Sequence, residues 1–217
     1  FTSIHNVKRA LASEKALIGF AGSPWTIATY MIGGGKVKDF SGIINFAEKE
    51  SKTFDAILDI LTEQVINLLI GQIKAGCDVV QIFDSWAAAV PSQYKDKWLW
   101  QSLRKIYTAL RATYTDVPII YYGRGVAIDY PDLISKMPSL CFGLDQSVNV
   151  RWARDAVQKF VPVQGNLDPE KLITADFQKD VEDILKNLGA GPFVFNLGHG
   201  ILPNTPIRHV YQLIEKI

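Results

Sequence analysis

The feature that most constrains this fold is a regular alternation of short apolar segments with longer amphipathic ones. The short segments are rich in β-branched and aromatic residues, which is typical of buried strands, and the longer ones repeat apolar residues at helical spacing. Strands are predicted at residues 16–20, 79–83, 118–122, 141–144, 161–164 and 193–197. Each is followed by a predicted helix, and such unbroken alternation favours a parallel sheet covered by helices.

Local signals mark the ends of several of these helices. Ser23 and Pro24 supply an N-cap and a first-turn proline for a short helix after the first strand. A long helix is predicted from about 53 to 75, with a glycine at its end. In the last helix, Thr205 is the predicted N-cap and Pro206 the first-turn residue. The apolar residues that mark three helices are Leu99, Leu103, Ile106 and Leu110; Phe177, Val181, Ile184 and Leu188; and Ile207, Val210, Leu213 and Ile214.

Two architectures fit this alternation, an open doubly wound sheet and a closed (β/α) barrel. No GxGxxG follows a strand to open a helix and no GxxxxGK[ST] occurs, so nothing marks a nucleotide-binding open sheet. A closed barrel needs eight strands and typically about 250 residues, whereas this chain has 217 residues and begins with Phe1. We therefore predict a single α/β domain over residues 1–217, a (β/α)8 TIM-barrel type with only six of the eight β/α units and the N-terminal two missing.

Composition excludes several classes of partner. The net charge of +1 is spread without a basic block, so neither nucleic acid nor a charged membrane surface is an expected partner. No uninterrupted apolar run is long enough to span a bilayer, and no membrane association is predicted. Cys77 and Cys141 stand far apart outside any CxxC, which is typical of a reduced, cytoplasmic protein.

Polar residues gather where the predicted strands end, and in a parallel barrel these ends face one mouth. Ser85, Arg124, Asp145 and Asp168 each follow a strand closely. His199 stands between two glycines after the last strand, where the backbone can approach a ligand. Each also has a structural explanation, since serine is common in turns, aspartate before proline suits a helix cap, and histidine often serves only as a hydrogen-bonding residue.

The sequence lacks the residue patterns that several common reaction types need. There is no GxSxG elbow for a serine hydrolase. The three histidines are distant in sequence from both cysteines, so no metal site is predicted. Asp84 and Asp145 could form a glycosidase pair, but nothing singles them out. The hydroxyls, imidazole, aromatic rings and backbone donors that remain suit a large planar ligand bearing several acidic groups.

Five segments, in order along essentially the whole chain, resemble motifs of the uroporphyrinogen decarboxylase family. They are GFAGSPWT with TYM (19–26 and 29–31), QIFDSWA (81–87), GLD (143–145), QGNLDP (164–169) and FNLGHG (195–200). The resemblance implies a (β/α)8 barrel lyase of haem biosynthesis, usually a homodimer, that uses neither metal nor organic cofactor. It would remove four acetate carboxyl groups from uroporphyrinogen III to give coproporphyrinogen III.

The resemblance also implies roles for individual residues. Tyr30, Ser85 and His199 match the family's substrate-contacting tyrosine, serine and histidine, and Phe20 and Phe83 match aromatic residues that line the pyrrole cleft. Hydroxyls and an imidazole can bond carboxylate side chains, while rings pack against the macrocycle.

The chain departs from the family at the catalytic centre. Nothing in it resembles the family's catalytic aspartate or its RQAGR-like arginine segment, so no catalytic residue is assigned. We expect the chain by itself to have poor or no activity, and Arg124 is a weakly supported substitute cation. Two alternatives stay open: a zinc-dependent methyltransferase acting on corrinoid or thiol carriers, which needs an HxC and a distant cysteine, and a non-catalytic tetrapyrrole-binding fragment.

Overall fold

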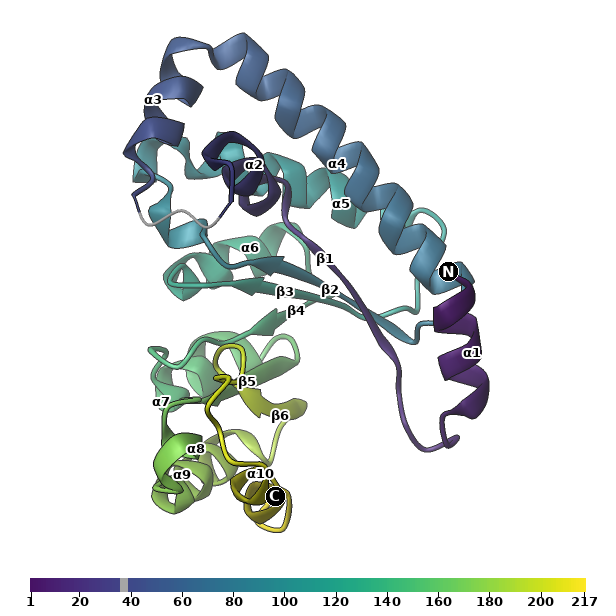
Figure 1. Ribbon diagram of the computed structural model, residues 1–217, viewed down its shortest axis with the longest axis vertical. Helices are drawn as coiled ribbons and strands as arrows, with labels where there is room; N and C mark the ends of the chain where they lie inside the picture. Colours follow the sequence, from purple (N-terminus) through teal and green to yellow (C-terminus); the bar gives the residue numbers. More distant parts are fainter. Residues whose placement is uncertain (36–38) are drawn as a thin grey trace. The chain divides into compact units, whose positions relative to one another are not determined.

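The computed structural model describes residues 1–35 and 39–217, and within them every predicted strand is confirmed, with ends displaced by at most three residues. The strands are β1 (Ile18–Gly22), β2 (Val79–Asp84), β3 (Ile119–Gly123), β4 (Leu140–Gly143), β5 (Val163–Leu167) and β6 (Phe193–Leu197). They form one sheet in chain order, β1 to β6 (Figure 1). Because β1–β2, β4–β5 and β5–β6 pair in parallel and helices intervene, the described fold is a partial (β/α) barrel.

The chain divides into two compact units, residues 1–121 and 122–217, and β3 runs across their boundary. The first unit has the helices α1 (Thr2–Ala10), α2 (Pro24–Gly33), α3 (Ser41–Lys49), α4 (Ser51–Lys74) and α5 (Gln101–Arg111). The second has α6 (Tyr130–Lys136), α7 (Val150–Ala153), α8 (Lys171–Thr174), α9 (Gln178–Leu188) and α10 (Ile207–Ile214). Shorter helical turns join them at Ala87–Ala89, Ser92–Tyr94, Asp96–Trp100, Ala127–Asp129 and Arg154–Gln158. A single domain over 1–217 stays a prediction.

An aromatic cluster forms the core of the first unit. Trp25 of α2 stacks on Trp98 with ring centroids 5.6 Å apart, and Phe54 of α4 lies edge-on to both rings. All three side chains are buried. Trp25 also donates from its indole nitrogen to the carbonyl of Trp86 at 2.9 Å, so the core is tied to the segment that follows β2.

The start of α2 is confirmed as predicted. The Ser23 hydroxyl accepts a hydrogen bond from the backbone N–H of Thr26 at 3.2 Å, and Pro24 occupies the first turn. The helix ends at Gly34, whose φ of 69° lies in the left-handed region that glycine adopts readily. These caps fix the entry of α2 directly after β1.

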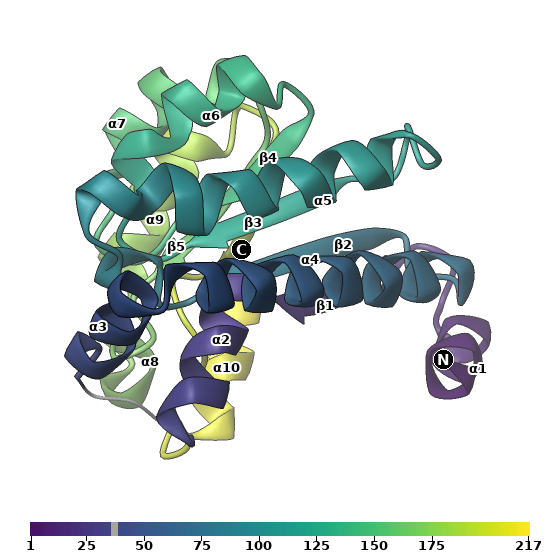
Figure 2. The same ribbon diagram turned by 90° about the horizontal axis from the view of Figure 1, so that it is seen from above.

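By length and composition alone α4 could cross a membrane, although Asp59 and Glu63 interrupt its apolar residues, so it is not the uninterrupted apolar run whose absence was predicted. One such helix is weak evidence, because an apolar helix packed in a protein core passes the same test. Here α4 lies beside α5 and against β1 (Figure 2). Its Asp59 forms an ion pair with Lys105 of α5 at 2.6 Å, and its Phe54, Val65 and Leu69 are buried, so α4 serves as a packing helix of the first unit.

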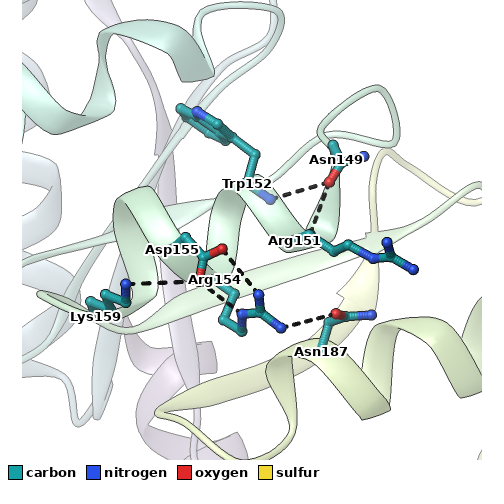
Figure 3. Close-up of polar contacts among 7 residues, drawn as sticks. All are labelled: Asn149, Arg151, Trp152, Arg154, Asp155, Lys159 and Asn187. Atoms are coloured by element: carbon teal, nitrogen blue, oxygen red, sulfur yellow. Dashed lines mark hydrogen bonds and ion pairs between the residues drawn. The ribbon is translucent and has the colours of Figure 1, made fainter.

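Polar contacts tie the helices of the second unit together (Figure 3). The Asn149 side chain accepts hydrogen bonds from the backbone nitrogens of Arg151 and Trp152, which caps α7. Arg154 bonds the Asp155 carboxylate and reaches the Asn187 side chain of α9 at 3.3 Å. The α9 residues predicted as an apolar face, Val181, Ile184 and Leu188, are buried together with the preceding Phe177.

The predicted last helix is confirmed as α10, with its N-cap one residue later than predicted and with Leu213 buried. Pro206 occupies the N-cap position, and among the described residues the buried Thr205 hydroxyl has no hydrogen-bond partner. Ile207 and Ile214 are 72% and 59% exposed, whereas His209 is buried. Nδ1 of His209 lies 2.7 Å from the carbonyl oxygen of Leu172 before the end of α8. His209 therefore lies on the same buried face of α10 as Leu213, four positions later.

Candidate functional site

In the first unit, two of the predicted site residues meet across neighbouring strands. Phe20 of β1 and Phe83 of β2 lie edge to face, with centroids 5.8 Å apart and planes at 80°. The register pairs Gly22 with Phe83, so Phe20 and Phe83 are diagonal neighbours on one face of the sheet. Phe20 is nevertheless 61% exposed, which leaves a large aromatic surface near the strand ends.

Asp84, at the end of β2, is a buried carboxylate held by hydroxyl donors. Its oxygens accept from the Thr26 hydroxyl of α2 at 2.7 Å and the Tyr121 hydroxyl of β3 at 3.1 Å. Burial raises the pKa of Asp84, while hydrogen bonds from Ser23, Thr26 and Tyr121 oppose that rise. The carboxylate therefore joins α2, β2 and β3, and it fixes the segment that carries Ser85.

Trp86 neighbours the other two predicted site residues of the first unit, Ser85 in the chain and Tyr30 in space. Ser85 precedes it in the chain and is half-buried, while the Tyr30 ring of α2 lies against the Trp86 ring at 6.3 Å. The backbone nitrogen of Trp86 donates to the Thr26 hydroxyl at 3.4 Å. Trp86 therefore belongs to the same hydrogen-bond network as Asp84. Tyr30 itself is 43% exposed and can offer its hydroxyl to a ligand. Trp86 lies inside the QIFDSWA motif, directly after the predicted strand end.

His199 belongs to the second unit, where Tyr122 of β3 holds its loop. The imidazole and the Tyr122 ring are nearly parallel, at 8° with centroids 6.4 Å apart. The Tyr122 hydroxyl donates to the carbonyl of Gly198 at 2.8 Å. A Cβ at Gly198 would come within 2.3 Å of the Gln146 backbone nitrogen, so the glycine permits close packing against the end of β4. Tyr122 thus positions the loop of His199, a contact that sequence reasoning did not predict.

The charges around His199 favour its neutral form. Burial and the positive charge of Arg124 both lower the pKa of His199, and Asp145 opposes them. Burial also raises the pKa of Tyr122. At neutral pH the imidazole is therefore uncharged and can donate one N–H, beside a phenol that stays protonated.

Asp145 is one of the two carboxylates considered for acid–base catalysis. Both of its oxygens accept hydrogen bonds from residues of the second unit. Its Oδ2 accepts from the Gly125 nitrogen at 2.7 Å, and its Oδ1 accepts from the nitrogen and the hydroxyl of Ser147. The Asn166 side chain donates to the Asp145 carbonyl at 3.0 Å and to the Val148 carbonyl at 2.8 Å. These contacts close the loop after β4, which indicates a structural role.

Tyr122→Phe is expected to lower the free energy of unfolding by about 1–2 kcal/mol, because the Gly198 carbonyl loses its donor in a buried site. Tyr211→Phe is the matched control, since that side chain is 65% exposed and should change stability by under about 0.5 kcal/mol. Urea unfolding of both variants measures the difference. Equal effects would contradict the role assigned to the hydroxyl.

The described residues contain no group of three or more His, Cys, Asp or Glu side chains placed to hold a metal ion. Cys77 is buried and Cys141 half-buried, and both are free thiols. Tyr30, Ser85, Phe20 and Phe83 thus lie in the first unit, where ring contacts join Phe20 to Phe83 and Tyr30 to Trp86, while His199 lies in the second.

A parallel sheet with polar and aromatic side chains at its strand ends defines a protein of the (β/α)-barrel class. Solved structures agree on this fold. A methyltransferase from Methanosarcina mazei has a TM-score of 0.78 and 18% identity, covering 99% of this chain and 61% of its own. A putative vitamin-B12 independent methionine synthase from Listeria monocytogenes has a TM-score of 0.54 and 14% identity, covering 98% of this chain and 67% of its own.

All residues, 1–217, match the family model of uroporphyrinogen decarboxylase (URO-D), and the chain belongs to this family. The uroporphyrinogen decarboxylase of Rhodospirillum rubrum is 38% identical over 100% of this chain and 63% of its own length. That of Chelativorans sp. is 39% identical over 100% of this chain and 64% of its own length. The chain therefore spans a little under two thirds of the length of these relatives, and the resemblance drawn from the five motifs is confirmed.

Proposed function

We propose that this chain is part of a uroporphyrinogen decarboxylase, a carboxy-lyase that removes the four acetate carboxyl groups of uroporphyrinogen III to give coproporphyrinogen III in haem biosynthesis. The observation that carries the proposal is the family match over all 217 residues. The fold is compatible with it, because aromatic rings and hydrogen-bonding side chains stand near the strand ends, where (β/α) barrels bind substrates.

The proposed substrate contacts divide by chemistry. Phe20 and Phe83 supply apolar surface for a macrocycle, which the 61% exposure of Phe20 supports. Tyr30, Ser85 and His199 supply hydrogen-bond donors for carboxylate side chains. A carboxylate accepts well from neutral hydroxyls and from a neutral imidazole N–H, and the lowered pKa of His199 keeps that group in this state.

The substrate itself can provide the electron sink. Protonation of a pyrrole carbon gives a cationic ring that accepts the electron pair of the C–C bond as carbon dioxide leaves. A second proton then adds to the methylene carbon that lost its carboxyl group, and the ring carbon releases the first proton to restore the pyrrole, so one proton is consumed for each carbon dioxide. The proposed reaction thus needs neither metal nor organic cofactor. The proton donor is not assigned to any residue of this chain, because the family's aspartate and arginine motifs have no counterpart in it.

The proposal includes a cytoplasmic homodimer without nucleic-acid or membrane partners. The balanced charge of +1 supports the absence of a polyanionic partner. Light scattering at several protein concentrations measures the oligomeric state, and flotation with vesicles measures membrane binding.

Anaerobic incubation with uroporphyrinogen III tests the activity, and quenching of uroporphyrin fluorescence tests binding. Saturable binding supports the proposal, whether decarboxylation by this chain is measurable or, as expected, slow. Absence of both binding and carbon dioxide release contradicts it. Stoichiometric zinc in the purified chain, with binding of a thiol carrier, would favour the methyltransferase alternative instead.

His199→Gln is expected to weaken uroporphyrin binding about tenfold or more, because a hydrogen bond to a charged carboxylate contributes about 1.5–3 kcal/mol. His5→Gln is the matched control, since His5 is exposed on α1 and should leave the affinity unchanged. Fluorescence titration of both variants gives the comparison. If the two variants bind equally well, His199 does not contact the ligand.

A further inference from the structure

Arg124 lies in a turn that is anchored on both sides within the second unit. It follows the last residue of β3 directly. Two positions before it, the Tyr122 hydroxyl bonds the Gly198 carbonyl at 2.8 Å, and one position after it, the Gly125 nitrogen bonds Asp145 at 2.7 Å. Gly125 has a φ of 71°, a conformation that glycine allows at no steric cost. The half-buried arginine is therefore held next to the loop of His199.

The guanidinium of Arg124 has no ion pair or hydrogen bond within residues 1–35 and 39–217. The carboxylate nearest in the network, Asp145, is occupied by the three donors described above. Two other arginines of this unit differ, because Arg154 bonds Asp155 and Arg208 bonds Nε2 of His209, whereas the guanidinium of Arg151 is exposed. Arg124 thus presents guanidinium N–H groups that no described residue accepts, in a half-buried position.

That charge acts on the predicted histidine. Arg124 opposes protonation of His199, and it also lowers the pKa of Tyr122 against the effects of burial and Asp145. A guanidinium offers two parallel N–H donors that match a carboxylate, and the neutral imidazole offers a third donor nearby. A carboxylate that reached both groups would accept hydrogen bonds from each of them.

We infer that Arg124 binds a side-chain carboxylate that the substrate keeps throughout the reaction, and so fixes the orientation of the polyacid. The inference rests on the proposed function for the identity of that polyacid. A guanidinium clamped on a departing carboxylate would stabilise the ground state and slow its loss, whereas a clamp on a retained carboxylate orients the ring without this penalty. Uroporphyrinogen carries both kinds, acetates that leave and propionates that stay.

Fluorescence titration with uroporphyrin and with coproporphyrin separates the two kinds of carboxylate. Arg124→Gln is expected to weaken binding of both about tenfold or more and by a similar factor, since both ligands have the retained propionates. Arg124→Lys should lose less, because it keeps the charge but not the fork. Arg151→Gln is the matched control, an exposed arginine of the same unit, and should bind like the wild type. A loss for uroporphyrin only, or no loss beyond that of Arg151→Gln, overturns the inference.

A second measurement tests the carboxylate site independently of the proposed function. Titration of glutarate, followed through the His199 ring signals by NMR, should shift those signals in the wild type and not in Arg124→Gln. Without ligand, Arg124→Gln should raise the pKa of His199, because a neighbouring positive charge is gone. If no porphyrin binds but glutarate behaves in this way, the proposed function fails and the anion site stands. If glutarate shifts the signals equally in both proteins, the site is refuted.

Discussion

Asp84→Leu should lower the free energy of unfolding by about 3–5 kcal/mol, because it leaves buried hydroxyl donors without an acceptor. The Thr26 and Tyr121 hydroxyls bond this carboxylate at 2.7 and 3.1 Å, and the Asp84 side chain is only 2% exposed. Leucine has the same branching but is larger than aspartate, so the change leaves no cavity, and the loss arises from unpaired polar groups and from tighter packing. Urea unfolding followed by tryptophan fluorescence measures it, since Trp25 and Trp98 lie in the same unit.

Two variants isolate the cause. Asp84→Asn keeps one acceptor oxygen and should cost about 1 kcal/mol, and Asp116→Asn, on an exposed loop residue, should be neutral. If Asp84→Leu proves no worse than Asp84→Asn, the hydroxyl network does not stabilise the first unit.

The pH dependence of the same variants has a defined sign. Burial raises the folded-state pKa of Asp84 above the ordinary value of 3.8, so between these two pKa values the folded protein binds more protons than the unfolded chain. The unfolding free energy of the wild type relative to Asp84→Asn should therefore be highest below about pH 4 and fall as the pH rises through the folded-state pKa. A relative stability that rises over this range would contradict the assignment.

The positions of the strands could be predicted from local sequence, but some of their ends could not. Apolar runs located every strand, but β5 continues to Leu167, beyond the predicted end at residue 164. Gly165 and Asn166 have the composition of a turn, yet they pair with Phe195 and Asn196 of β6. Pairing between residues about thirty positions apart overrides the local preference, and no local pattern shows it.

In the candidate site, too, local sequence patterns identify some residues, while long-range contacts decide how they meet. The motifs named Phe20 and Phe83, but their contact depends on the register that pairs Gly22 with Phe83, which alternation within each strand does not give. The contact of Tyr122 with His199 was not predictable either, because it joins the ends of β3 and β6 through a ring contact and a hydrogen bond to Gly198. In the same way, the hydrogen bond between His209 and the Leu172 carbonyl joins α10 to α8, a contact that no local pattern shows.

Gly165→Ala is the second substitution with a large expected effect, a loss of about 4 kcal/mol in the free energy of unfolding. The residue has a φ of 136°, which L-residues with a side chain rarely adopt, and a Cβ there would lie 2.6 Å from the carbonyl oxygen of Leu144. Strain of this kind costs about 1–3 kcal/mol, and the overlap with a backbone atom adds a comparable amount. Calorimetry or urea unfolding measures the sum.

Gly200→Ala is the matched control, because no described atom lies within 4 Å of the position that its Cβ would take and its φ is not positive. It should change stability by at most about 1 kcal/mol. The comparison bears on the site as well, since Asn166, next to Gly165, holds the carbonyl of Asp145 at 3.0 Å. Displacing Asn166 frees the loop whose carboxylate anchors Gly125, so Gly165→Ala should also weaken the ordering of Arg124. Similar unfolding midpoints for the two glycine variants would show that the β4–β5 contact tolerates a side chain at residue 165.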